Sequence, residues 1–186
     1  DVKGTLKVMR TWADDADEHV RRLASEGSRP RLPWSFRLEA IDREPRLTKP
    51  ILDRLRNDPA LYVRKSVANH LNDFSKSDPG HVLETLRAWD LRKPHSAWIA
   101  KHACRTLIKS GDPDTLAHFA FDTTVKVRVD GFAVEPATIR LGDTIELSFT
   151  LASTAAQAQR LVVDYALHSP KANGQVSRKV FKLKEL

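Results

Sequence analysis

Tyr62-Val63-Arg64-Lys65-Ser66-Val67-Ala68 is one of three similar stretches in this chain of 186 residues. The other two are His19-Val20-Arg21-Arg22-Leu23-Ala24 and Trp98-Ile99-Ala100-Lys101-His102-Ala103. The offset is 43 residues from Val20 to Val63 and 36 residues from Val63 to Ile99. Helix pairs that recur about every 40 residues are typical of HEAT-like repeats, which stack into a curved solenoid with a concave face. We therefore predict a mainly α protein with a HEAT-like α–α superhelix over residues 1–122.

Apolar spacing in this part of the chain supports the helical prediction. Apolar residues recur three or four positions apart, as they do at Val63, Val67, Leu71 and Phe74. Turn signals separate such stripes at Asp58-Pro59, Asp78-Pro79, Lys93-Pro94 and Gly111-Asp112-Pro113. A small residue also recurs in each repeat, where we expect neighbouring repeats to pack closely: Ala24, Ala68 and Ala103.

The pattern changes near residue 122 to the strict alternation of strands. The alternating sets are Val125/Val127/Val129, Ile145/Leu147/Phe149/Leu151, Leu161/Val163/Tyr165/Leu167 and Phe181/Leu183. Turn residues lie between them at Gly142-Asp143 and Asn173-Gly174. We predict a small immunoglobulin-like β-sandwich domain over residues 123–186. Since about five strands can be counted and such a sandwich needs about seven, we expect the domain to be C-terminally incomplete.

The charge permits a nucleic-acid partner without establishing one. The net charge is +7, and basic side chains bind phosphates with release of counterions. The excess is spread along the chain: residues 123–186 hold 9 basic and 6 acidic residues, and residues 1–122 hold 22 and 18. This distribution excludes a dense basic tail.

Other classes of protein are disfavoured by the sequence. It has no run near the roughly 18 apolar residues of a membrane span, and no secretory signal. The single cysteine, Cys104, cannot form an internal disulfide and lies in an apolar helical stripe, so we predict a core residue and a cytoplasmic protein. The histidines have no metal-ligand spacing, so we expect no metal site. Because the chain opens inside a helical pattern, we expect the helical domain to be N-terminally incomplete.

Two long segments carry a resemblance to a known family. They are Val20-Arg-Arg-Leu-Ala-Ser-Glu-Gly-Ser-Arg-Pro-Arg-Leu-Pro-Trp34 and Tyr62-Val-Arg-Lys-Ser-Val-Ala-Asn-His-Leu-Asn-Asp-Phe-Ser-Lys76. Together they resemble the AlkC branch of the alkylpurine DNA glycosylases, which are relatives of AlkD built from HEAT-like repeats. In the β half, Val163-Asp164-Tyr165, Lys171–Gly174 and Lys179–Lys184 are similar to the family's C-terminal immunoglobulin-like domain. The resemblance covers nearly the whole chain.

The resemblance implies an activity and a site. The activity is monofunctional hydrolysis of the N-glycosidic bond of a cationic alkylated base, such as 3-methyladenine, in double-stranded DNA without a deep base pocket. The implied catalytic residues are Glu26, Trp34 and Asp73, with Arg29 beside them. A further acidic residue used upstream by the family has no counterpart here. No cofactor is implied, and we expect a monomer that works on the DNA of the bacterial nucleoid.

These residue types suit that chemistry. A carboxylate stabilises positive charge that develops on the sugar and accepts a proton from water. A Trp face attracts a cationic base by about 0.5–2 kcal/mol. Arg and Lys bind phosphates, and polar side chains add further contacts. The predicted DNA-binding residues are Arg22, Arg29, Arg31, Arg64, Lys65, Asn69, Asn72 and Lys101.

Each residue also has a structural alternative. Glu26 precedes Gly27 at a helix C-terminus, where a carboxylate is electrostatically disfavoured, and it could simply pair with Arg22 or Arg29. Trp34 could be a packing anchor and Asp73 a cap, while Asn69 and Asn72 could bond backbone or DNA. The main rival function is a non-catalytic HEAT-repeat scaffold that binds nucleic acid or protein. The glycosylase hypothesis predicts that the three catalytic candidates converge on one concave surface, whereas the scaffold hypothesis does not.

Overall fold

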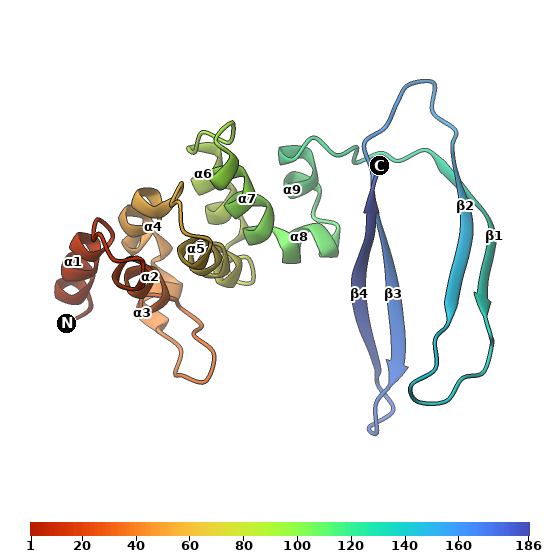
Figure 1. The fold of residues 1–186 in the computed structure, drawn as a ribbon, viewed down its shortest axis with the longest axis horizontal. Coiled ribbons are helices and arrows are strands. Elements are labelled where there is room, and N and C mark those ends of the chain that lie inside the picture. Colours follow the sequence, from red (N-terminus) through yellow and green to blue (C-terminus); the bar gives the residue numbers. More distant parts are fainter. The chain divides into compact units, whose positions relative to one another are not determined.

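The computed structural model describes all 186 residues, which divide into two compact units, Asp1–Thr115 and Leu116–Leu186. The first unit is helical, and the second contains all four strands (Figure 1). The boundary between the two units falls after Thr115, within the last helix. The change from helical to alternating hydrophobic pattern in the sequence lies seven residues later, near residue 122. No helix is both long and apolar enough to cross a membrane.

The helices follow one another along the first unit in colour order from red to green in Figure 1. Their bounds are α1 Val2–Trp12, α2 Glu18–Glu26, α3 Glu39–Arg43, η1 Pro45–Leu47, α4 Lys49–Leu55, α5 Leu61–Phe74, α6 Pro79–Arg87, α7 Pro94–Ala103, α8 Arg105–Ser110 and α9 Pro113–His118. The three repeated sequence stretches lie in α2, α5 and α7, and α5 packs against both of the others.

Proline and aspartate set where several helices begin. Pro79 and Pro94 each occupy a first helical position, where the missing N–H costs nothing and the fixed φ suits a helix. The side chain of Asp78 caps α6 by accepting a bond from the backbone N of His81 at 2.9 Å. Helix α7 begins at Pro94, four positions before the repeated stretch that opens at Trp98, because proline sets the first turn there.

The core lies where the repeats meet. Val63, Val67, Leu71 and Phe74 are fully buried, which confirms the predicted stripe of α5. The predicted small positions Ala24, Ala68 and Ala103 are fully buried as well, so the helices approach closely there. Cys104 is also fully buried, and burial raises the pKa of its thiol to about 12, which confirms a core role.

The β unit contains two antiparallel pairs of strands. Strand β1 (Val127–Glu135) pairs with β2 (Glu146–Ser153), and β3 (Val162–Pro170) pairs with β4 (Val176–Glu185). Gly174 has a φ of 79° in the predicted turn between β3 and β4. Across that second pair, Tyr165 lies opposite Phe181 with their rings stacked 5.2 Å apart. The structure thus has four strands, one fewer than the about five expected from alternation, and each of the four alternating sets contributes to one of them.

Candidate active site

Helix α5 carries a buried polar stripe beside its buried apolar one. Ser66, His70 and Asp73 are spaced four and three residues apart, which places them on one face. All three are buried, and each bonds to a residue at or just beyond the C-terminal end of α2. The stripe therefore connects two consecutive repeats through polar groups instead of apolar packing.

Arg29 joins the two predicted carboxylates. Its Nε donates to Asp73 Oδ2 at 2.8 Å and its Nη2 to Asp73 Oδ1 at 3.2 Å, while its Nη1 donates to Glu26 Oε1 at 2.7 Å. The exposed fractions of the side chains are 8% for Arg29, 12% for Asp73 and 20% for Glu26. One guanidinium therefore fixes two carboxylates that are nearly buried yet still reached by solvent.

Glu26 has partners on both carboxylate oxygens. Besides Arg29 on Oε1, Ser66 Oγ donates to Oε2 at 2.6 Å and Arg22 Nη2 lies 3.4 Å from the same oxygen. Glu26 is the last residue of α2, where the helix dipole disfavours an anion. The two guanidiniums and the hydroxyl offset that cost.

Burial and ion pairing shift the pKa values of Asp73 and Arg29 in opposite directions. Burial raises the pKa of Asp73 above its ordinary value, and Arg29 offsets this only in part. Burial acts to lower the pKa of the Arg29 guanidinium, but its bonds to Asp73 and Glu26 outweigh that effect and raise it. Arg29 therefore stays charged, while Asp73 is a better proton acceptor than an ordinary aspartate.

His70 lies beneath this set as a neutral residue. Its Nδ1 lies 3.0 Å from the carbonyl oxygen of Ser25, which can only accept, so Nδ1 carries the proton. Burial above all, with a smaller contribution from the Arg29 charge, lowers the pKa of the imidazole to about 3. Neutral His70 therefore ties the backbone of α2 to α5 immediately before Glu26.

Trp34 lies in the loop between α2 and α3. It is fully exposed and has a φ of 64°, a conformation that costs a bulky residue about 1–3 kcal/mol. The loop is closed behind it by a bond from Leu38 N to Pro30 O at 3.0 Å. Because the ring is fully exposed, Trp34 is no packing anchor. The structure brings Glu26 and Asp73 together, but no bond or ring contact joins Trp34 to them.

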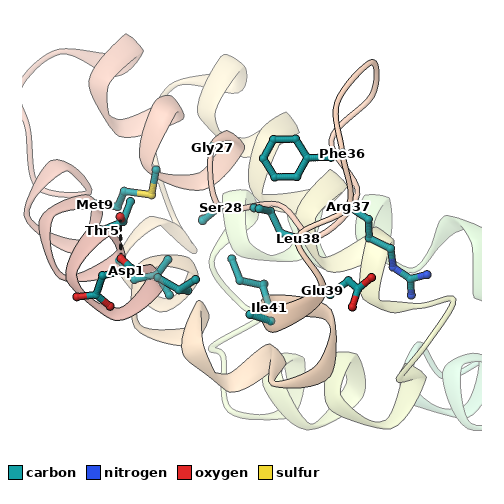
Figure 2. A pocket seen from close by; sticks show the side chains of 13 residues that line it. Asp1, Thr5, Met9, Gly27, Ser28, Phe36, Arg37, Leu38, Glu39 and Ile41 are labelled. Carbon is teal, nitrogen blue, oxygen red and sulfur yellow. Dashed lines mark hydrogen bonds between the residues drawn. The ribbon is translucent and has the colours of Figure 1, made fainter.

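The base of the same loop borders an apolar cavity of about 480 Å³. Figure 2 shows Leu38 and Ile41 directed into it, with Met9 of α1 on one side and Phe36 at the rim. Its polar lining residues, such as Arg37 and Glu39, include neither Glu26 nor Asp73. The carboxylate pair therefore lies outside this cavity, which lacks the converging polar groups of a reaction site.

The comparisons with known proteins agree with this arrangement. Residues 128–186 match the family described as uncharacterised protein YhaZ, C-terminal Ig-like domain. The chain is 42% identical over 185 residues to the uncharacterized protein YhaZ of Bacillus subtilis (strain 168), covering 100% of this chain and 51% of YhaZ. It is 54% identical to the alkylpurine DNA glycosylase AlkC of Pseudomonas fluorescens, solved bound to DNA containing an abasic site analog. The TM-score is 0.92 over 98% of this chain and 51% of that one.

The resemblance to AlkC is therefore confirmed over nearly the whole chain. This confirms the predicted fold class, including the immunoglobulin-like nature of the β unit. The chain spans about half the length of both relatives.

Four of the predicted DNA-binding residues are exposed or half-buried, although Arg22 and Arg64 also donate to backbone carbonyls. Lys65 and Lys101 are exposed, at equivalent places in the second and third repeated stretches. The guanidinium carbon of Arg22, at the equivalent place in the first, lies 4.1 Å from the centre of the Tyr62 ring. Arg64 is half-buried, with its guanidinium carbon 5.9 Å from the centre of the Trp98 ring. In each of these two contacts, an arginine of one repeat lies beside an aromatic ring of the next repeat.

Other predicted DNA-binding residues are bonded to partners inside the helical unit. Arg29 holds the carboxylates through all of its nitrogens. Arg31 lies 3.4 Å from Asp42, and Asn69 accepts a 3.0 Å bond from Arg105. Asn72 is buried and donates to the carbonyl of Ala103 at 2.8 Å. Of the two alternatives left open for Asn72, the structure favours the bond to backbone, because the side chain is enclosed between α5 and α7.

Ser66 and His70 belong to the site but were not predicted from the sequence. The available signal was their spacing of seven and three residues from Asp73, which places all three side chains on one face of a helix. No group of three or more histidine, cysteine or carboxylate side chains is arranged to hold a metal ion.

Proposed function

We propose that the protein is a DNA repair glycosylase that hydrolyses the N-glycosidic bond of cationic alkylated purines such as 3-methyladenine in duplex DNA. The observation that carries the proposal is the pair of nearly buried carboxylates, Glu26 and Asp73, held in place by one guanidinium. The identity of 54% with an alkylpurine DNA glycosylase supports the reaction class.

The carboxylates suit a reaction in which positive charge moves from base to sugar. The bond breaks with its electron pair going to the base, which leaves neutral and needs no general acid. The sugar then carries positive charge, which Glu26 stabilises as a fixed anion. Water adds to the sugar and gives a proton to Asp73, whose raised pKa favours this transfer. The reaction ends at an abasic site with no covalent intermediate, and it requires no cofactor.

Trp34 and the basic residues would bind the substrate. The exposed Trp34 ring offers its face to a cationic base, which discriminates against neutral bases. Arg22, Lys65 and Lys101 would hold phosphates of the alkylated duplex. In this proposal the protein acts as a monomer on the DNA of the nucleoid, since every residue invoked comes from one chain.

The test is release of 3-methyladenine from methylated duplex DNA by the intact protein, Glu26→Gln and Asp73→Asn. Glu84→Gln is a matched control, because Glu84 is exposed and paired only with Arg46. We expect both site variants to lose at least about a hundredfold in rate, with affinity for duplex DNA containing an abasic-site analog kept. Equal rates for all variants would remove these carboxylates from the mechanism.

A non-catalytic scaffold is the second candidate, because the ion pairs of Glu26 with Arg22 and Arg29 are also those of a structural clasp. In that case the wild-type protein would bind duplex DNA or a protein partner and release no base. The two site variants would then differ from wild type in thermal stability alone.

A further inference from the structure

We propose that Ser66 is a positioning residue for Glu26, an inference that rests on the proposed glycosylase function. Ser66 is fully buried in α5, and its Oγ lies 2.6 Å from Glu26 Oε2. Bonds from a hydroxyl to an ionised carboxylate are short and about twice as strong as bonds between neutral groups. The buried hydroxyl therefore fixes the position of the Glu26 carboxylate, which solvent still reaches.

The direction of the bonds follows from the proton count. A serine hydroxyl has one proton, and an ionised carboxylate has none to give. Ser66 therefore donates to Glu26, and the second contact of Ser66, 3.1 Å from Ser25 Oγ, is one in which Ser66 accepts. The result is a relay from Ser25 through Ser66 to Glu26.

The backbone beneath Glu26 is held from the same helix. His70, one turn after Ser66, donates to the carbonyl of Ser25. The main chain before Glu26 is thus fixed by α5, and the carboxylate itself is fixed by Ser66.

Ser66 and Arg29 hold opposite oxygens of the carboxylate. Arg29 binds Oε1 from the loop side, and Ser66 binds Oε2 from α5. With Ser66 removed, only Arg29 and the more distant Arg22 would hold Glu26, and both guanidiniums would draw it toward themselves. Because catalytic groups act only within a narrow geometry, loss of the hydroxyl reduces the rate without removing the carboxylate.

The experiment compares single-turnover base release by wild type, Ser66→Ala and Ser66→Cys. Alanine removes the donor, and cysteine fills the space with a weak donor, so the pair remains informative if a cavity at alanine impairs folding. Ser96→Ala is the matched control, since Ser96 is equally buried but bonds the carbonyl of Arg56. We expect both Ser66 variants to be about tenfold slower. The control should be within about twofold of wild type, and the Kd for duplex DNA containing an abasic-site analog should not change.

A double-mutant cycle separates positioning from structural damage. In the Glu26→Gln background, Ser66→Ala should cause no more than about a twofold further loss, because the charged acceptor is gone. Equal losses in both backgrounds would overturn the inference, as would a wild-type rate for Ser66→Ala. A wild-type protein that releases no base would instead refute the proposed function, so the two failures are distinguishable.

Discussion

Arg29 and Asp73 form a two-point ion pair between the loop after α2 and the polar stripe of α5, with N to O distances of 2.8 and 3.2 Å. The third nitrogen of the same guanidinium reaches Glu26. The helical repeats are thus joined by charge at the point where the proposed reaction occurs, and the stability of the unit and its chemistry depend on the same side chain.

Removal of the Arg29 charge should destabilise the protein strongly. Arg29→Met keeps an apolar stem but leaves two nearly buried carboxylates without their cation, a change that costs about 3–5 kcal/mol in buried pairs. Urea denaturation followed by circular dichroism measures the free energy of unfolding. Arg46→Met is the control, because the Arg46–Glu84 pair is exposed and worth at most about 1 kcal/mol. Equal losses in the two variants would mean that the Arg29 ion pairs add nothing to stability.

The buried imidazole of His70 should make stability depend on pH below neutrality. Its pKa in the folded protein is about 3, against an ordinary 6.5, so the unfolded chain binds the extra proton first. The stability contributed by neutral His70 is present above pH 6.5 and is lost as the pH falls toward 3, by up to about 1.4 kcal/mol per pH unit. Unfolding free energies of wild type and His70→Gln between pH 5 and 6.5 test this. The variant should show the smaller slope, and parallel lines would contradict the expectation.

Substitution of Trp34 should separate catalysis from stability. The ring is fully exposed and its φ is positive, a conformation that asparagine tolerates better. Trp34→Asn should therefore leave the melting temperature unchanged or higher, and slow release of a cationic base by about 2- to 30-fold through loss of the cation–π contact. Phe36→Ala, at another exposed aromatic of the same loop, should retain the wild-type rate. If Trp34→Asn lowered the melting temperature and kept the rate, the ring would be structural.

Lys65 should contribute to DNA affinity only by an electrostatic contact with a backbone phosphate. Lys65→Gln removes one exposed charge, so the slope of log K against log salt for duplex DNA should fall by about 0.9. The single-turnover rate at saturating protein should not change. Lys109→Gln removes an exposed lysine outside the repeated stretches and should leave the slope as it is. Identical slopes for Lys65→Gln and wild type would remove Lys65 from the DNA-binding surface.

The sequence by itself determined the class of fold and the packing positions. Helical spacing at Val63, Val67 and Leu71 predicted a buried face, and the small residues at Ala24 and Ala103 marked close approach; both are confirmed by burial. These features are readable because periodicity and residue size act locally along a chain. Resemblance in two segments then singled out Glu26 and Asp73, although nothing in the sequence stated that they meet.

Only the tertiary structure decided what the polar side chains do. Arg29, expected on phosphate, holds carboxylates 3 and 44 positions away, and Asn72 bonds a carbonyl 31 positions away. Ser66 and His70 likewise bond to residues 40 and 45 positions away, Glu26 and Ser25. The partner of a polar group depends on which elements pack together, and a hydrogen bond is made or lost within a few tenths of an ångström. Hydrophobic pattern specifies which faces are buried, but only the packed repeats bring distant donors and acceptors within that distance.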